Sequence, residues 1–328
     1  MKILITGSTG QLARELQVEL AGTGKLLALG HNALDLAVPE QIREQVRLLR
    51  PDLIINAAAY TAVDPAESHR EQAFAVNARG PQVLAEEAAR LGVPLIHYST
   101  DYVFDGRKAE PYDEHDTPNP LGVYGASKLA GEQAIQAVGG EHLILRTSWV
   151  YSQHGKNFLL TMQRLLQERD ALSVVSDEVG APTWAASIAR ATAEIVRKRQ
   201  AGEGGPGGLY HLTASGETSW YGFACSIAEH LVAVAHRRAE VVAALAGGGA
   251  EAEETPEASL HGLAEVGAKG EVAIDEAVFL VPVGGRQGVA VGRHQVDHVG
   301  AGLLAQLLQQ PVGAVAHVRF LGVLQGGA

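Results

Sequence analysis

A tyrosine and a lysine four residues apart are the first pair in this sequence that could do chemistry. The segment YGASK (124–128) puts Tyr124 and Lys128 on one face of an expected helix. A nearby ammonium lowers the pKa of a phenol, so we expect Tyr124 to exchange a proton near neutral pH. Thr100 follows a strand-like run and could hold the reacting oxygen by a hydrogen bond. This spacing is also common on surface helices, so the pair needs support from the rest of the chain.

Glycines near the N-terminus offer a second candidate site, for phosphate. The segment GSTGQLA (7–13) lies between a short apolar run and a helical pattern. Gly7 and Gly10 would allow a tight turn close to a pyrophosphate, and the helix N-terminus would supply N–H groups. Ala13 replaces the third glycine of the dinucleotide motif, where helix–strand packing is the main demand. An ordinary strand-to-helix turn has the same pattern, so the motif alone does not decide.

The elements that must position these residues alternate along the chain. Apolar strands are expected at 3–5, 26–29, 53–55, 94–97 and 143–145, and helices at 12–20, 39–49, 72–91 and 124–138. Continuous apolar strands separated by amphipathic helices indicate a parallel sheet covered on both faces. We therefore predict an α/β fold, with a Rossmann-like doubly wound parallel sheet over residues 1–148. Its ligands would lie at the carboxyl ends of the strands.

Composition narrows the class of partner. The formal net charge is −11, from 26 Lys+Arg against 37 Asp+Glu, with no block of like charge, which disfavours nucleic acid and anionic membranes. Hydrophobic residues make up 46% of the chain, which excludes a disordered protein. The single cysteine, Cys225, fits a reducing cytosol, and no apolar run reaches the ~18 residues of a membrane span. A cytoplasmic protein with a small-molecule site is the expectation.

The choice of nicotinamide cofactor depends on position 30, at the tip of the second strand. Sites that prefer NADH usually keep a carboxylate there for the ribose hydroxyls, and this chain has Gly30. Asp35 is expected on the adenine side, and no arginine follows the strand to bind a 2′-phosphate. NADPH is favoured only because no carboxylate at position 30 would repel its 2′-phosphate, and NADH stays open as the cofactor.

Taken together, the residues resemble the extended short-chain dehydrogenases/reductases and, within them, the dTDP-4-dehydrorhamnose reductase family. The resemblance runs from residue 1 to about residue 232 and is strongest in STDYVFDG (99–106) and RTSWVY (146–151). It also includes GSTGQLARE (7–15), NAAAYTAVD (56–64), YGASKLAGE (124–132) and GAPT (180–183). The fold it implies is the predicted Rossmann-like sheet with a smaller α/β substrate domain.

The resemblance implies a reaction. NADPH would give hydride to the 4-keto carbon of dTDP-6-deoxy-L-lyxo-4-hexulose, yielding dTDP-L-rhamnose for cell-surface polysaccharide. Tyr124 would protonate the oxygen, Lys128 would tune Tyr124 and bind the ribose, and Thr100 would be the third catalytic residue.

It also implies ligand-binding residues. The cofactor would be contacted by Gly7, Gly10, Gln11, Leu12, Asp35, Leu36, Ala59, Tyr60, Thr61, Tyr98, Tyr124 and Lys128, and the sugar nucleotide by Thr100, Asp101, Tyr102 and Trp149. A lone tryptophan after a strand is more often a core residue, but the RTSWVY motif favours sugar contact for Trp149. Asn77 would support the active-site backbone rather than touch substrate.

Some members of the family use Mg²⁺ to pair subunits through acidic side chains. Glu15 matches one such position, but Ala185 and Ala186 stand where a second carboxylate would be expected. The resemblance thus leaves Mg²⁺ and a homodimer as open expectations.

The last hundred residues depart from this pattern. We expect residues 149–232 to form part of the substrate domain, with elements around 171–200 returning to the first. Residues 233–328 hold 16 glycines, one serine, one threonine and no Asn, Tyr, Trp, Cys or Met. We hypothesise a shifted reading frame there. The alternative is a genuine divergent tail with helices at 239–246 and 303–308.

Other functions stay open at this stage. A non-enzymatic nucleotide-binding subunit, like the regulatory subunit of methionine adenosyltransferase, resembles the same family, and the atypical C-terminal region would suit it. A sugar-nucleotide epimerase or dehydratase is disfavoured, because a dehydratase usually has extra acidic residues after the catalytic threonine. The intact set Thr100, Tyr124 and Lys128 favours the reductase.

Overall fold

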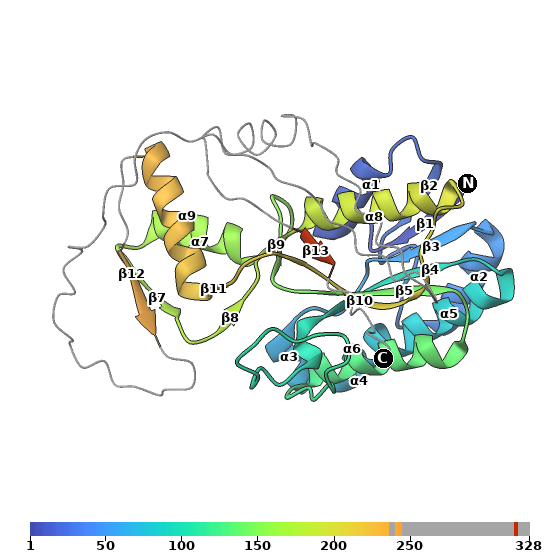
Figure 1. Cartoon of the computed structure of the whole chain (residues 1–328), viewed down its shortest axis with the longest axis horizontal. Coiled ribbons are helices and arrows are strands. Elements are labelled where there is room, and N and C mark those ends of the chain that lie inside the picture. Colours follow the sequence, from blue (N-terminus) through green and yellow to red (C-terminus); the bar gives the residue numbers. More distant parts are fainter. Residues whose placement is uncertain (236–239, 245–317, 321–328) are drawn as a thin grey trace, which may run out of the picture.

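The main sheet is the part of the fold that positions the candidate site residues. A computed structural model describes residues 1–235, 240–244 and 318–320. Within them, seven strands pair in the order β13-β10-β5-β4-β3-β1-β2 (Figure 1). They are β1 (Lys2–Thr6), β2 (Lys25–Leu29), β3 (Leu53–Asn56), β4 (Leu95–Thr100), β5 (His142–Thr147), β10 (Gly208–Ala214) and β13 (Val318–Phe320).

Strand direction and order create a binding crevice. Six of these strands are parallel, namely β10, β5, β4, β3, β1 and β2, and β13 pairs antiparallel with β10. β2 lies on one side of β1 and the later strands lie on the other. Where strand order reverses in this way, the connections leave in opposite directions and a crevice opens at the carboxyl ends.

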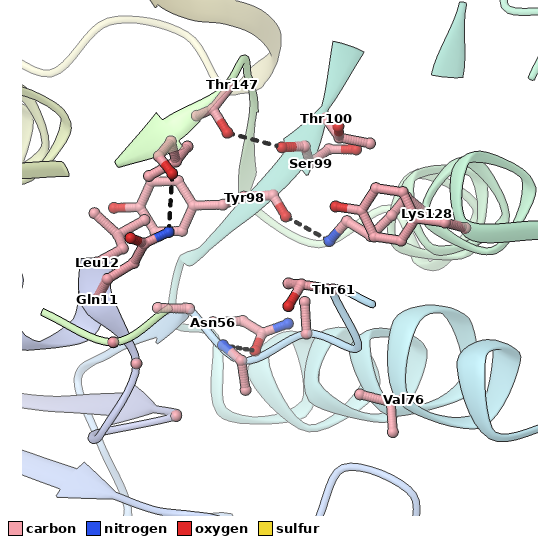
Figure 2. A pocket seen from close by; sticks show the side chains of 18 of the residues that line it. Gln11, Leu12, Asn56, Thr61, Val76, Tyr98, Ser99, Thr100, Lys128 and Thr147 are labelled. Atoms are coloured by element: carbon pink, nitrogen blue, oxygen red, sulfur yellow. Dashed lines mark hydrogen bonds between the residues drawn. The ribbon is translucent and has the colours of Figure 1, made fainter. Parts of the chain in front are cut away.

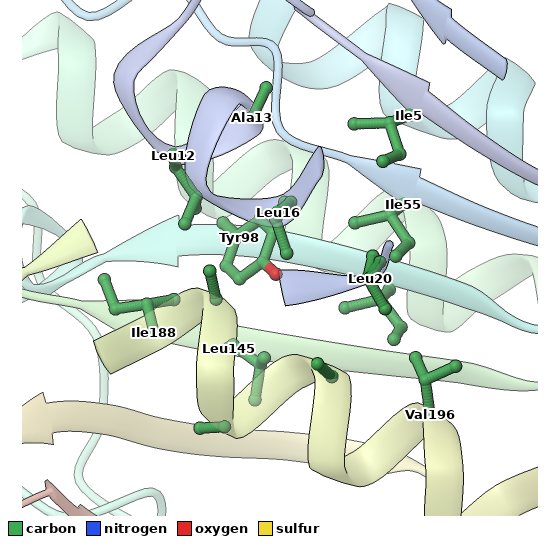
Figure 3. Packing of buried hydrophobic residues seen from close by; sticks show 14 of the residues in the cluster. Ile5, Leu12, Ala13, Leu16, Leu20, Ile55, Tyr98, Leu145, Ile188 and Val196 are labelled. Atoms are coloured by element: carbon green, nitrogen blue, oxygen red, sulfur yellow. The ribbon is translucent and has the colours of Figure 1, made fainter. Parts of the chain in front are cut away.

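Two hydrophobic clusters cover the two faces of the sheet. Successive residues of a strand face opposite sides, so Ile3 and Ile5 join one cluster and Leu4 joins the other. Figure 3 shows the first cluster, where side chains of α1 and α8 pack on the strands. The helices of that face are α1 (Gln11–Glu19) and α8 (Ala185–Gln200), and those of the other are α2 (Pro39–Leu49), α5 (Gly80–Leu91) and α6 (Val123–Val138). The predicted doubly wound fold is confirmed.

The helix expected over 72–91 is interrupted. It consists of α4 (Arg70–Phe74), one π-helical segment η1 (Ala75–Arg79) and α5, after a short α3 (Val63–Ser68). Pro81 cannot donate an N–H to the preceding turn, so the regular pattern restarts there. A Cβ on Gly80 would come within 2.7 Å of the Leu36 carbonyl oxygen, so the close approach of α5 to the loop after β2 requires glycine.

A smaller unit lies beside the main sheet (Figure 1). Its core joins Met162, Leu166, Leu172 and Ile227. The elements are α7 (Phe158–Glu168), β7 (Ala171–Val175), α9 (Trp220–Ala235) and β12 (Glu240–Ala244), and two small pairings link it to the rest: β6 (Val150–Tyr151) with β9 (Thr183–Trp184), and β8 (Val179–Gly180) with β11 (Thr218–Ser219).

Residues 171–200 divide between the two units. β7 pairs with β12 in the smaller unit, whereas α8 packs on α1 and β10 joins the main sheet. We therefore propose that the nucleotide-binding domain comprises residues 1–148 together with α8 and β10.

One expectation for the tail is wrong. Residues 240–244 form a strand rather than part of a helix over 239–246, because Val241 and Val242 favour extended backbone and the segment pairs parallel with β7. The expected helix over 303–308 lies outside the described residues, as does most of the segment for which we hypothesise a shifted frame. In the part of the chain that the structure describes, none of the helices combines the length and apolarity of a membrane span.

Candidate active site

A cavity of about 760 Å³ opens at the carboxyl ends of β1, β3 and β4 (Figure 2). It brings together fifteen of the residues proposed from the sequence: Gly7, Gly10, Gln11, Leu12, Asp35, Leu36, Ala59, Thr61, Tyr98, Thr100, Asp101, Tyr102, Tyr124, Lys128 and Trp149. The glycine turn after β1 and the Tyr124–Lys128 pair therefore line the same cavity.

The glycine turn is built as a dinucleotide fold requires. Gly7 has φ +69°, and a Cβ there would lie 2.9 Å from the Cα of Ala58, so a side chain is excluded twice. Gly10 donates its N–H to the Gly7 carbonyl (2.8 Å) and precedes α1 without a side-chain cap. The first N–H groups of α1 are thus available to an anion.

Gln11 joins this turn to the second half of the chain. Its Nε2 donates to the Val150 carbonyl (3.0 Å), and its Oε1 accepts from Asn157 Nδ2 (3.2 Å). The side chain of Gln11 therefore ties the glycine turn to residues 150 and 157. Contact with a phosphate would come from the backbone N–H of Gln11.

Tyr60 departs from its expected place. It is absent from the cavity wall, and its hydroxyl hydrogen-bonds His69 Nδ1 (3.0 Å) instead. Its backbone is held by Asn77, which accepts from the Tyr60 N–H (2.8 Å) and donates to the Tyr60 carbonyl (2.9 Å). Asn77 also donates to Ser127 Oγ (3.0 Å), so it links the loop after β3 to α6.

Tyr124, Thr100 and Asp101 form a connected group. Tyr124 hydrogen-bonds Thr100, Thr100 Oγ1 donates to Asp101 Oδ1 (3.0 Å), and Ser148 Oγ donates to Asp101 Oδ2 (2.8 Å). Burial raises the pKa of Asp101 against the hydrogen bonds from Ser148 and Thr100. Asp101 therefore accepts from both hydroxyls and orients the side chain of Thr100 beside Tyr124.

The pKa of Tyr124 corrects our expectation. We expect the charge of Lys128, aided by a nicotinamide cation, to lower it, whereas in the protein by itself the pKa is raised well above its ordinary value. Burial is the largest cause, the hydrogen bond with Thr100 offsets part of it, and Asp101 and Tyr102 raise the pKa further. The phenol is accordingly held in its protonated form.

Lys128 is almost fully buried and lies deep in the cavity (Figure 2). Its Nζ donates to the Tyr98 carbonyl (2.7 Å) and lies 3.4 Å from His97 Nε2. Burial lowers the pKa of Lys128 to about 8, although Glu132 opposes the shift. The Tyr98 hydroxyl points elsewhere, to Thr192 Oγ1 of α8 (2.8 Å).

Two stacked tryptophans wall the cavity on the side of the smaller unit. Trp149 and Trp220 are nearly parallel, with ring centroids 3.5 Å apart. Trp149 has φ +44°, and a Cβ on Gly180 would lie 2.5 Å from its ring, so Gly180 makes room for the indole. Trp220 is held by a hydrogen bond from Nε1 to Glu178 (3.1 Å).

Comparisons with known proteins decide the family. The model of the RmlD substrate binding domain matches residues 1–262. A dTDP-4-dehydrorhamnose reductase of Burkholderia thailandensis is 49% identical over 231 residues, 69% of this chain and 77% of the relative, and one of Escherichia coli K12 is 48% identical over 233 residues, 70% and 78%.

The chain belongs to the dTDP-4-dehydrorhamnose reductase family. A solved structure agrees: the Bacillus anthracis dTDP-4-dehydrorhamnose reductase in complex with NADP has a TM-score of 0.69 and 36% identity, and covers 75% of this chain and 84% of that one. These matches confirm the resemblance stated from the sequence motifs.

Sequence reasoning missed several cavity residues of this family member. Trp220 had a signal, since the stretch TSWYGF (218–223) resembles the family, whereas Lys156 stands in a loop with no pattern around it. Other residues of the wall that were not proposed as site residues from the sequence include Thr9, His31, Ser99, Thr147, Gly155 and Asn157.

Glu15 does not fit a metal centre formed by one chain of this reductase family. It lies buried on α1, with Oε1 3.9 Å from His154 Nε2, and burial raises its pKa. Among the described residues no three side chains of the His, Cys, Asp and Glu types gather around a common point. Mg²⁺ prefers six oxygen ligands, and Glu15 offers one carboxylate beside a nitrogen.

Proposed function

We propose that this protein reduces dTDP-4-dehydro-6-deoxy-L-mannose to dTDP-L-rhamnose with NADPH, as an NAD(P)-dependent oxidoreductase of rhamnose and cell-surface polysaccharide biosynthesis. One observation carries the proposal: the glycine turn at α1 and the group Thr100, Tyr124 and Lys128 line one cavity. The names of the relatives at 48–49% identity supply the substrate.

The proton comes from Tyr124. When bound, NADPH would supply the hydride, and the ketone oxygen would then gain negative charge. The raised pKa keeps the Tyr124 phenol protonated until that charge develops. Thr100 would turn its hydroxyl from Asp101 to the same oxygen, so that two hydroxyls donate to it. A donor that is held ready at such an oxygen is worth roughly 3 kcal/mol of transition-state stabilisation.

Lys128 restores the proton that Tyr124 gives away. A lysine with a pKa of about 8 is mostly ammonium at neutral pH, yet it releases its proton far more readily than an exposed lysine. The same ammonium would bind the cofactor ribose. It has three N–H donors, and the Tyr98 carbonyl takes only one of them.

The remaining cavity residues divide by position. On the cofactor side, Gly7, Gly10 and the N–H groups of Gln11 and Leu12 would meet the pyrophosphate, Asp35 and Leu36 the adenosine, and Ala59, Thr61 and Tyr98 the nicotinamide half. Tyr60 would contribute through its backbone alone. The sugar nucleotide would be contacted by Thr100, Asp101, Tyr102, Trp149 and, in addition, Trp220.

NADPH is the proposed cofactor, and NADH is the alternative. The Bacillus anthracis relative was solved with NADP. No carboxylate stands at position 30 to repel a 2′-phosphate, and the nearest acidic side chain along the loop, Asp35, accepts the Ala37 N–H (2.8 Å).

A separate proposal concerns the assembly and location of the protein. We propose a homodimer whose subunits pair through Mg²⁺, located in the cytoplasm. Glu15 Oε1 is buried without a hydrogen-bond partner among the described residues, as a carboxylate awaiting a shared cation would be. Sedimentation with Mg²⁺ and with EDTA tests it: an unchanged mass in the two buffers would remove Mg²⁺ from subunit pairing. For location we propose the cytoplasm, because a single cysteine fits a reducing compartment.

The deciding experiment measures NADPH oxidation with the 4-keto sugar nucleotide made enzymatically from dTDP-glucose. Reductase activity requires NADPH loss and formation of dTDP-L-rhamnose together. NADPH binding without turnover would favour the non-catalytic nucleotide-binding subunit, and conversion to an epimer without net oxidation would favour an epimerase.

A further inference from the structure

A line of polar side chains runs through the sheet from β1 to α6 beneath the cavity. Thr6 Oγ1 donates to Asn56 Oδ1 (2.6 Å), Asn56 Nδ2 lies 2.9 Å from His97 Nδ1, and His97 Nε2 lies 3.4 Å from Lys128 Nζ. All four residues are at most 2% exposed. Three parallel strands thus connect to the lysine of the active site, and the reaction as described above uses only the last member.

The orientation of the Asn56 amide fixes the imidazole tautomer. The backbone N–H of Ala58 can only donate, and it reaches both Thr6 Oγ1 (3.1 Å) and the Asn56 amide atom that faces Thr6 (3.3 Å). That amide atom is therefore the oxygen, and the NH₂ group faces His97. An NH₂ group needs an acceptor, so His97 Nδ1 carries the lone pair and the ring proton of neutral His97 sits on Nε2.

This tautomer turns an N–H toward Lys128. An ammonium carries three donors and no acceptor, whereas an amine has a lone pair that can accept from Nε2–H. Nζ already uses one proton for the Tyr98 carbonyl. The contact with His97 is therefore favourable when Lys128 is an amine and unfavourable when it is an ammonium.

We propose that His97 is a positioning residue for Lys128: its Nε2–H, fixed by Asn56, donates a hydrogen bond to the Nζ amine and so favours the amine over the ammonium. The proposal rests on the proposed function, in which Lys128 returns a proton to Tyr124. By weakening the hold of Lys128 on its proton, His97 speeds that return.

The other charged and titratable groups around Lys128 come from three elements. Glu132 of α6 opposes loss of the Lys128 proton, but Arg146 of β5 pairs with both its carboxyl oxygens (2.9 and 2.6 Å). Tyr124 on α6 and Asp101 after β4 face the same cavity. Burial, followed by the charge of Lys128, lowers the pKa of His97 well below its usual value, so the ring stays neutral throughout.

The first test is the pH profile of kcat/KM for the His97→Asn variant. Asparagine can still meet Asn56 through its short amide but cannot reach Lys128. We expect the alkaline limb to move upward by about one pH unit, because the ammonium no longer faces an N–H. His211→Asn is the matched control: His211 is likewise a buried strand histidine, packed edge-on against Phe104, and its loss should leave the limb where it is. An alkaline limb of His97→Asn that overlays the native one, at whatever rate, overturns the proposal.

The second test needs neither a variant nor turnover. In the ¹⁵N-labelled native chain, with His97 assigned through its backbone resonances, long-range ¹H–¹⁵N spectra should show Nε2 protonated and Nδ1 bare. A proton on Nδ1 would refute the tautomer and the proposal with it. Absence of reductase activity would instead refute the proposed function and leave this measurement standing.

Discussion

At the scale of single residues, the proposed reaction depends on a phenol that keeps its proton. Burial and the charge of Asp101 both act against the phenolate of Tyr124, and the hydrogen bond with Thr100 offsets only part of this effect. A group of this kind is suited to donate a proton to an oxygen that is becoming negative. The chemistry therefore needs the phenol hydroxyl and little else of the side chain.

Replacement of Tyr124 by phenylalanine tests this directly. We expect kcat to fall by about 10²- to 10⁴-fold, the usual worth of a general acid, while the Kd for NADPH stays within about twofold. Single-turnover kinetics and a fluorescence titration with NADPH measure the two quantities. Turnover retained within about tenfold would exclude Tyr124 as the acid.

A second prediction concerns Gly30 and the choice between NADPH and NADH. A Cβ at this position would lie 3.1 Å from Ser8 Oγ, a side-chain atom that can rotate away, so Gly30→Asp should fold. The new carboxylate would accept from the ribose hydroxyls of NADH and repel the 2′-phosphate of NADPH. We expect the ratio of kcat/KM values to shift toward NADH by at least about tenfold, or ~1.4 kcal/mol. Gly30→Asn, without the charge, is the control, and an unchanged ratio in Gly30→Asp would mean that Gly30 lies away from the ribose.

At the scale of elements, the position of α6 matters most, because it carries both Tyr124 and Lys128. A buried ion pair between Glu132 and Arg146 fastens this helix to β5, with the two side chains 2% and 5% exposed. Asn77 adds a second tie through Ser127. The π-helical segment that contains Asn77 is thus part of how the catalytic helix is placed.

Removal of one charge from this ion pair should destabilise the whole fold. In Glu132→Gln we expect the free energy of unfolding in urea to fall by about 3–5 kcal/mol, because Arg146 keeps a buried charge without its partner. Glu168→Gln removes one charge from the exposed pair with Arg164 and should cost less than about 1 kcal/mol. Equal losses in the two variants would show that the buried pair does not anchor α6.

At the scale of the whole molecule, the cavity draws on distant parts of the chain. All of its lining residues in the described part fall between residues 7 and 157, except Trp220. The described residues of the proposed cofactor side therefore all precede the atypical segment 233–328. We expect a defect in that segment to affect binding of the sugar nucleotide more than binding of NADPH.

Replacement of the residues after Leu231 by the C-terminal segment of a relative tests this division. We expect kcat/KM for the 4-keto sugar nucleotide to rise while the Kd for NADPH changes by less than about threefold. Isothermal titration and initial rates give the two values, and intact-mass measurement of the native protein checks the reading frame independently. An ordinary enzymatic rate from the native chain would mean that residues 233–328 work as they stand and that the frame-shift hypothesis is wrong.

The sequence by itself determined strands β1 to β5 of the main sheet, the glycine turn and the Tyr124–Lys128 pair. Each depends on spacing within a few residues: apolar runs make strands, Gly7 and Gly10 permit one turn, and four residues make one helical turn. Because parallel strands share one edge, such local signals also predict that their carboxyl ends meet in one site.

Only the tertiary structure decided what surrounds those residues. It stacks Trp220 on Trp149, turns Tyr60 toward His69 and sets His97 behind Lys128. It also reverses the expected pKa shift of Tyr124, since desolvation depends on every atom packed around a group and not on the nearest charge in sequence. Contacts between side chains 31 or 71 positions apart leave no local pattern, and so the proton chemistry of the site could be derived only from the folded chain.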